Sequence, residues 1–171
     1  MFTCMNCSYT ATSLTMEGAN FYIMQTTPVS LKKQLYSKLL INLIINGIII
    51  LSSCLTMYFT TPVKFGWTVL AFFVCLLVNV GFLCYTLTVE LQNPMIDWHD
   101  KSEITSHKNT TKCSLMGLLT GLITGAFAFK FYLIAPQRAW FELLILAGVF
   151  AGYNIYLLIR KQNYLIKQIN K

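Results

Sequence analysis

The sequence has few charged residues, and acidic residues are fewer than basic ones. Only 11% of the 171 residues are charged, and six Asp and Glu stand against 13 Lys and Arg. A water-soluble domain carries about 25% charged residues, so this chain lacks the polar surface that contact with water on all sides requires. With 56% hydrophobic residues, the composition excludes a disordered tail and an ordinary soluble domain. Lipid is the solvent that fits.

The sequence also lacks the motifs that would indicate an enzyme. It has no Ser/His/Asp arrangement, no phosphate-cradling glycine-rich loop and no paired carboxylates inside an apolar run. His99 and His107 lie in an acidic polar stretch, but their spacing matches no closed metal site. Cys4 and Cys7 form a lone CxxC, which favours packed or free thiols over zinc. We therefore expect no catalytic residue, no metal and no cofactor, and a membrane-embedded enzyme is the least favoured class.

Four apolar stretches are long enough to cross a membrane. A bilayer core about 30 Å thick needs roughly 20 residues of helix. The four stretches are residues 39–59, 66–89, 115–135 and 139–159. Short connections after the first and third predict two antiparallel hairpins, which the polar loop 90–114 joins. The sequence therefore predicts an all-α, polytopic transmembrane helical bundle that forms a single membrane domain.

The segments before and between these spans complete the predicted layout. Residues 1–14 are a weaker apolar stretch that looks like the inner end of a further membrane helix, so we expect either a fragment or a truncated subunit. Residues 15–38 are expected to lie in the cytoplasm and to include a short interfacial helix, and residues 160–171 form a cytoplasmic tail.

Basic residues indicate the orientation of the spans, because Lys and Arg gather on the cytoplasmic side of membrane proteins. Three lie on the other side: Lys64, Lys130 and Arg138. Ten lie on the side of the long loop and the tail: Lys32, Lys33, Lys38, Lys101, Lys108, Lys112, Arg160, Lys161, Lys167 and Lys171. The sequence therefore predicts a multi-pass protein of the cell membrane with a cytoplasmic C-terminus. Short basic clusters between apolar runs also argue against nucleic acid as a partner.

Small residues recur at every fourth position in the last two spans. They are Gly117, Gly121 and Gly125 in one span, and Gly148 and Gly152 in the other. Such rows let helix backbones approach closely in lipid, so they predict a tightly packed helix pair. A surface that slides during a transport cycle would have the same geometry, and the sequence leaves both interpretations open.

Two amides, Asn42 and Asn46, share one face of the first span. An amide in hydrocarbon needs a polar partner, so this face is expected to look into the protein. A contact between helices is the favoured interpretation, and contact with a substrate is the alternative.

The polar segment 15–29 is too short to cross a membrane, yet it contains Phe21 and Tyr22. Thr27 followed by Pro28 predicts a helix N-cap with proline in the first turn, which would start the helix that enters the membrane. On physical grounds alone, an interfacial amphipathic piece is the simplest interpretation.

Two segments resemble permease subunits of ABC exporters from Gram-positive bacteria, in the C-terminal portion of those subunits. The first segment has Glu17-Gly18, Phe21-Tyr22 and Thr27-Pro28-Val29-Ser30, followed by Lys38. The second has Glu90, Pro94, Asp97-Trp98, Glu103 and Lys108-Asn109.

The resemblance implies a permease that is driven by a separate cytoplasmic ABC ATPase subunit. Glu17, Gly18, Phe21 and Tyr22 would contact the ATPase, and Pro28 would set the angle into the span. Hydrolysis would occur in the partner, so this chain would not itself be an enzyme. Further permease helices or a second permease copy would complete the transporter. The alternative is a small accessory or assembly subunit that does not transport.

Overall fold

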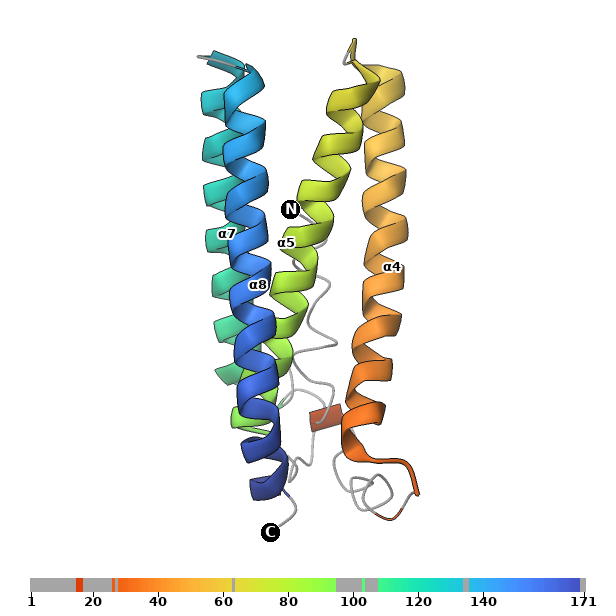
Figure 1. The fold of residues 1–171 in the computed structure, drawn as a ribbon, viewed down its shortest axis with the longest axis vertical. Coiled ribbons are helices and arrows are strands. Elements are labelled where there is room, and N and C mark those ends of the chain that lie inside the picture. Colours follow the sequence, from red (N-terminus) through yellow and green to blue (C-terminus); the bar gives the residue numbers. More distant parts are fainter. Residues whose placement is uncertain are drawn as a thin grey trace.

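Four long helices form the described part of the protein. In this computed structural model the described residues are 15–16, 26, 28–62, 64–94, 103, 108–133 and 136–169, and among these the side chains at 128, 130–133, 136–140 and 163–169 are not described. The helices are α4 (Leu31–Thr60), α5 (Phe65–Gln92), α7 (Lys108–Leu133) and α8 (Pro136–Ile169). They run side by side along the long axis, and successive helices point in opposite directions (Figure 1). The described residues thus form an all-helical bundle.

All four helices are long enough to cross a membrane, and three of them are also apolar enough. The shortest has 26 residues, which is about 39 Å at 1.5 Å per residue and exceeds a hydrocarbon core of about 30 Å. Among the described residues, three helices are long and apolar enough to span: Leu31–Thr60, Phe65–Gln92 and Phe141–Gln162. α7, the predicted third span, is not among them, so a crossing by α7 stays a prediction.

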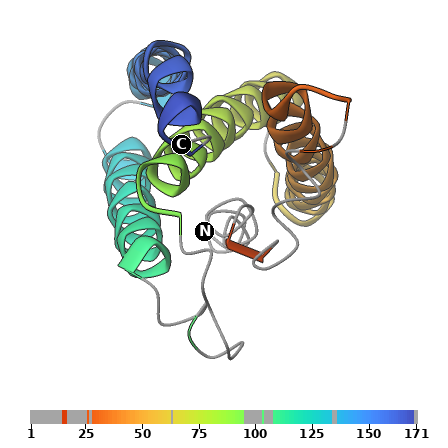
Figure 2. The same cartoon turned by 90° about the horizontal axis from the view of Figure 1, so that it is seen from below.

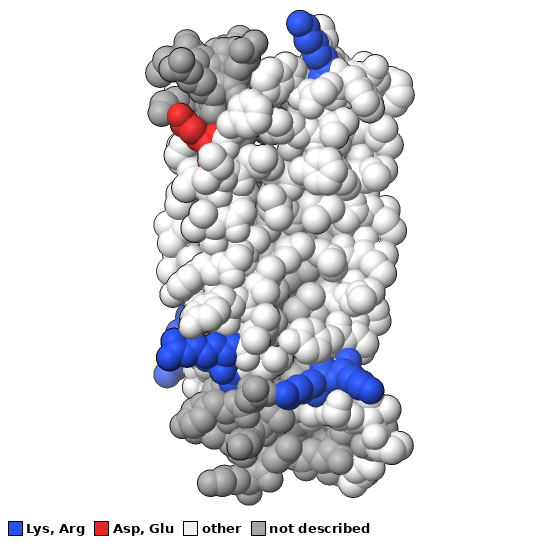
Figure 3. Space-filling model, in the orientation of Figure 1, with Lys and Arg blue, Asp and Glu red and all other residues white. Residues whose placement is uncertain are grey.

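Large apolar side chains on the outer surface of the bundle also fit a membrane. On α4 and α8 these include Ile48 at 63% exposure, and Ile145 and Val149 at 65% each. In the space-filling view the middle of the molecule shows neither Lys and Arg nor Asp and Glu (Figure 3). A surface of this kind suits contact with lipid tails.

Several hydroxyl groups on α4 are compatible with that setting, because they bond within the helix. Ser53 Oγ donates to the carbonyl of Ile49 at 2.9 Å, and Thr56 Oγ1 donates to Ser52 at 2.7 Å. Such bonds satisfy the hydroxyl hydrogen without water. These polar residues therefore do not oppose burial of α4 in lipid.

The start of α4 differs from the sequence prediction. Ser30 is the N-cap, and its carbonyl accepts from Lys33 N at 2.9 Å, so Pro28 lies at a bend before the helix and not in its first turn. The side chain of Gln34 donates to the carbonyl of Val29 at 2.8 Å. This bond holds Val29 outside the helix, and the helix begins three residues later than predicted.

The helices also extend beyond the predicted spans. α5 continues to Gln92, so Glu90 belongs to a helix and not to the loop, and α7 begins at Lys108 within the predicted loop. α8 continues to Ile169 through most of the predicted tail. No Gly or Pro follows Gly152, so nothing in the sequence stops that helix.

α5 is the central helix of the bundle. It lies between α4 and α8, and α7 packs mainly on α8 (Figure 2). Leu35 of α4, Leu87 of α5 and Leu158 of α8 belong to one core cluster, and Val74 of α5 packs with Leu143 of α8 in another. α5 thus carries most of the contacts that hold the described helices together.

Among the glycines whose surroundings the structure describes, Gly81 makes the closest contact with a neighbouring helix. A Cβ on Gly81 would lie 2.7 Å from Phe150 Cδ1 and 2.9 Å from Ala151 Cα. A Cβ on Gly125, Gly148 or Gly152 would meet nothing within 4 Å, so the predicted tight pairing of α7 with α8 does not occur at these three positions. Gly117 is buried and Gly121 is half-buried.

Large side chains take part in the contacts of α7 and α8 with the core of the bundle. Phe127 of α7 packs beside Leu143 and Ala147 of α8, and Met116 of α7 and Phe150 of α8 join another cluster. Rings and long chains at such contacts hold helix backbones farther apart than small residues on both helices do.

Basic residues mark one end of the bundle, which we call the basic end. Its described members are Lys32, Lys33, Lys38, Lys108, Lys112, Arg160 and Lys161. Their helices begin or end there, and Lys and Arg form a belt at this level (Figure 3). A hydrogen bond of 2.7 Å from Tyr36 Oη to Gln162 Oε1 links α4 and α8 near the same end. A cytoplasmic location of this end stays a prediction.

Candidate functional site

The most unusual group among the described residues is a buried carboxylate at the basic end. Glu90 lies in the last turn of α5 and is 0% exposed. A carboxylate removed from water needs strong compensation from hydrogen bonds or opposite charge. The donors that reach Glu90 therefore define the candidate site.

The donors come from two segments that are far from each other in the sequence. Glu90 Oε1 accepts from Thr15 N at 2.9 Å and from Thr15 Oγ1 at 2.6 Å. Glu90 Oε2 accepts from Asn109 Nδ2 at 3.1 Å. Thr15 and Asn109 are each 0% exposed. One side chain of α5 thus bonds both to Thr15 and to Asn109 at the start of α7.

Asn109 also closes the end of α5. Its Nδ2 donates a second bond of 2.7 Å to the carbonyl of Asn93, the residue that caps α5. The last carbonyl groups of a helix have no partner within the helix, so a donor from another segment stabilises this end. We call Thr15, Glu90, Asn93 and Asn109 the Glu90 cluster.

An apolar layer lies beside the cluster. Cys113, one turn after Asn109, packs with Val89 and Tyr85. Burial, and then the negative charge of Glu90, raise the pKa of the Cys113 thiol to about 12, and Lys112 opposes this shift. A neutral, buried thiol fits the interpretation of this cysteine as a packing residue.

The structure joins the second of the two segments that carry the resemblance to Thr15, a residue close to the start of the first. Thr15 stands two residues before Glu17, and Glu90 and Asn109 belong to the second motif. The structure places Pro28 at the bend before α4 and leaves Pro94 and Glu103 half-buried. The predicted positions that lie outside the described residues are Glu17, Gly18, Phe21, Tyr22, Asp97 and Trp98.

Sequence reasoning missed several of the polar residues that the structure buries, among them Thr15, Asn79 and Asn154. Thr15 is 75 residues from Glu90 in sequence, and no local pattern connects the two. Asn79 and Asn154 are 3% and 4% exposed, while predicted Asn46 is 3% exposed and Asn42 is half-buried. Asn79 and Asn154 each stand as a single amide within a long apolar run, and this pattern could have predicted that they face the interior of the bundle.

Asn79 is a buried amide whose replacement is expected to change the stability of the protein. In the part of the chain that the structure describes, neither Oδ1 nor Nδ2 of Asn79 has a hydrogen-bond partner. Because a buried amide without partners costs about 1–3 kcal/mol, Asn79→Leu is expected to stabilise the protein by about that amount. Unfolding by SDS in mixed micelles measures the change.

Asn154→Leu is the matched control. Asn154 is also buried, but its Nδ2 donates to the carbonyl of Phe150 at 2.8 Å. Its replacement is expected to destabilise by about 0.5–1.5 kcal/mol. A loss of stability in Asn79→Leu would contradict the prediction and would show that a polar group bonds to Asn79.

The described part of the chain offers no cluster of metal ligands. The described residues contain no group of three or more His, Cys, Asp or Glu that could hold a metal ion. Cys4, Cys7, His99 and His107 lie outside them. The chemistry of the Glu90 cluster is therefore the chemistry of a buried, hydrogen-bonded junction between segments.

Comparison with known proteins gives no relative. No protein-family model matches the chain, and neither the characterised proteins nor the solved structures contain a significant match.

Proposed function

We propose that this chain is a permease component of an ATP-driven ABC export system in the cell membrane, or a C-terminal part of such a component. A separate cytoplasmic ATPase would dock on residues 17–25, with Phe21 and Tyr22 as the aromatic anchors. The spans would move in response and give the substrate access to alternate sides of the membrane.

The Glu90 cluster is the observation that carries this proposal. The resemblance rests on two segments, and hydrogen bonds of 2.6–3.1 Å join residues in or beside both of them at one carboxylate. A push on the N-terminal segment would reach α5 directly through Glu90 and α7 through Asn109. A protein that couples a cytoplasmic ATPase to membrane helices needs a rigid link of this kind.

Affinity purification tests the proposal. The full chain carries a C-terminal tag, is purified from membranes of its native host in mild detergent, and its partners are identified by mass spectrometry. The proposal expects an ATPase with nucleotide-binding motifs at a stoichiometric level. Recovery of a membrane complex without any ATPase would contradict it and would favour the accessory subunit.

The variant Phe21→Ala/Tyr22→Ala locates the contact. Loss of both anchors is expected to reduce the recovered ATPase about tenfold or more, because aromatic anchors carry much of the binding energy of an interface. The matched control is Tyr153→Ala/Tyr156→Ala, which removes two aromatics that are 61% and 56% exposed on α8. Equal recovery with both double variants would place the docking surface elsewhere.

A further inference from the structure

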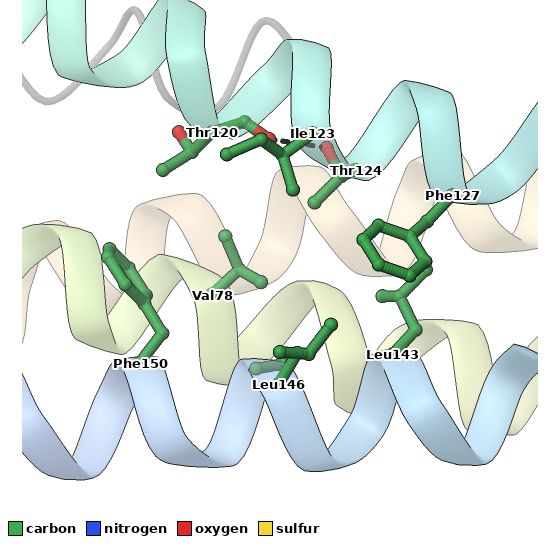
Figure 4. Close-up of a pocket in the computed structure, with 9 residues that line it drawn as sticks. Val78, Thr120, Ile123, Thr124, Phe127, Leu143, Leu146 and Phe150 are labelled. Carbon is green, nitrogen blue, oxygen red and sulfur yellow. Dashed lines mark hydrogen bonds between the residues drawn. The ribbon is translucent and has the colours of Figure 1, made fainter.

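A cavity of about 190 Å³ lies between α5, α7 and α8. Val78 comes from α5, Ile123 and Phe127 from α7, and Leu143 and Leu146 from α8 (Figure 4). An engineered protein cavity of about 150 Å³ with similar walls stays dry and binds benzene. The space here therefore suffices for a hydrocarbon segment of about six carbons.

The walls of this cavity suit an apolar occupant. None of the lining residues is charged, and the polar ones are Thr120 and Thr124. Thr120 Oγ1 donates to the carbonyls of Met116 at 3.0 Å and Gly117 at 2.9 Å, and Thr124 Oγ1 donates to Thr120 at 2.8 Å. Each hydroxyl hydrogen thus has an acceptor on its own helix. A water molecule needs two to four polar partners, so this cavity offers it poor sites.

The cavity is open to the surroundings of the bundle on one side. Its deepest residues, Leu143 and Ala147, are 6% and 2% exposed, whereas Ile123 of α7 and Leu146 of α8 are 55% and 48% exposed. The exposed pair forms a rim between the two helices. Leu146 belongs to the segment Phe141–Gln162, which is long and apolar enough to span a membrane. A bilayer around this segment would therefore bring lipid tails to the rim.

We propose that this cavity binds an acyl chain of a membrane lipid. Acyl chains are the apolar groups that a surrounding bilayer would bring to the rim, and an empty cavity forfeits the dispersion contacts of its lining atoms. In lipid, such van der Waals contacts are a main source of helix association, so a bound chain fills the gap between α7 and its neighbours. The proposal does not depend on an ATPase partner.

Photolabelling tests this site directly. The full chain is reconstituted in phosphatidylcholine nanodiscs with a small fraction of phosphatidylcholine that carries a diazirine in the middle of one acyl chain. After illumination, mass spectrometry maps the labelled residues. Lipids that only surround the protein label exposed residues, such as Ile44 and Ile48 at 54% and 63% exposure. The proposal expects labels also on Leu143 and Ala147, which surrounding lipids do not reach.

Matched variants separate cavity binding from general contact. Thr124→Phe places a ring in the cavity and is expected to reduce the labels on Leu143 and Ala147 at least fivefold. Gly125→Phe adds the same ring at a neighbouring position where nothing lies within 4 Å of a Cβ, so those labels are expected to persist. Thr120→Phe repeats the test if Thr124→Phe does not fold. Unchanged labelling of Ile44 and Ile48 shows intact insertion.

Three results would overturn the proposal. The first is labelling that is confined to exposed residues. The second is labelling of Leu143 and Ala147 that is reduced neither in Thr124→Phe nor in Thr120→Phe. The third is protection of Ile123 and Leu146 together with the deep residues, which would show that another protein surface covers the rim.

Discussion

Replacing Glu90 with leucine is expected to destabilise the protein by about 2–4 kcal/mol. The change leaves Thr15 N, Thr15 Oγ1 and Asn109 Nδ2 without their acceptor in a site that is 0% exposed. Hydrogen bonds to a charged group contribute about 1.5–3 kcal/mol each, and the lost cost of burying the charge offsets part of that sum. Unfolding by SDS in mixed micelles measures the difference.

A double-mutant cycle distinguishes this junction from simple packing. Asn109→Leu alone is expected to cost about 3 kcal/mol, because it leaves the carboxylate and the Asn93 carbonyl short of a donor. The double variant Glu90→Leu/Asn109→Leu is expected to lose about 1–3 kcal/mol less than the sum of the single variants. Additive losses would contradict a direct bond between the two side chains.

Gly81→Val is expected to have the second large effect. It should lower the free energy of unfolding by about 2–3 kcal/mol. A Cβ there lies within 2.9 Å of Ala151 Cα, which is backbone and cannot rotate away. α5 and α8 must separate to admit the side chain, and their contact is the most extensive in the described bundle. Thermal unfolding in detergent measures the loss.

Gly47→Val is the control for that substitution. Gly47 lies in the middle of α4, and nothing lies within 4 Å of a Cβ at this position. The free energy of unfolding of this variant is expected to lie within about 0.5 kcal/mol of the wild-type value, as is usual for substitutions away from packed contacts. Equal losses at positions 47 and 81 would contradict the close approach of α5 to α8.

Hydropathy predicted the helical class and most of the length of each helix. Long apolar runs identify helices because their backbone groups must bond internally in lipid. Helix ends were predicted less accurately. At the end of α5, for example, the carbonyl of Asn93 accepts a bond from Asn109, 16 residues away, which no local pattern shows. Fourfold glycine spacing overstated the contact of α7 with α8 at Gly125, Gly148 and Gly152, because spacing alone does not show which side chains stand opposite.

The neighbours of each helix could not be predicted, and the site depends on them. α4 and α5 are apolar on nearly every face, so no amphipathic stripe indicates which side packs inward. Glu90 was selected through the resemblance, but its burial and its partner Thr15 depend on contacts across 75 residues. The contact residues proposed for the ATPase, Glu17 to Tyr22, lie outside the described residues and stay predictions.

Hydrogen exchange at the Thr15 amide tests most directly whether Glu90 joins the N-terminal segment to α5 and α7. The wild type and Glu90→Leu are compared in nanodiscs by mass spectrometry, with amides in the middle of α4 as the internal standard. The wild-type Thr15 amide, bonded to Glu90 Oε1 at 2.9 Å, is expected to be protected. In the variant it is expected to exchange about tenfold faster, together with the first amides of α7. Fast exchange of Thr15 in the wild type, or equal rates in the two proteins, would contradict the junction.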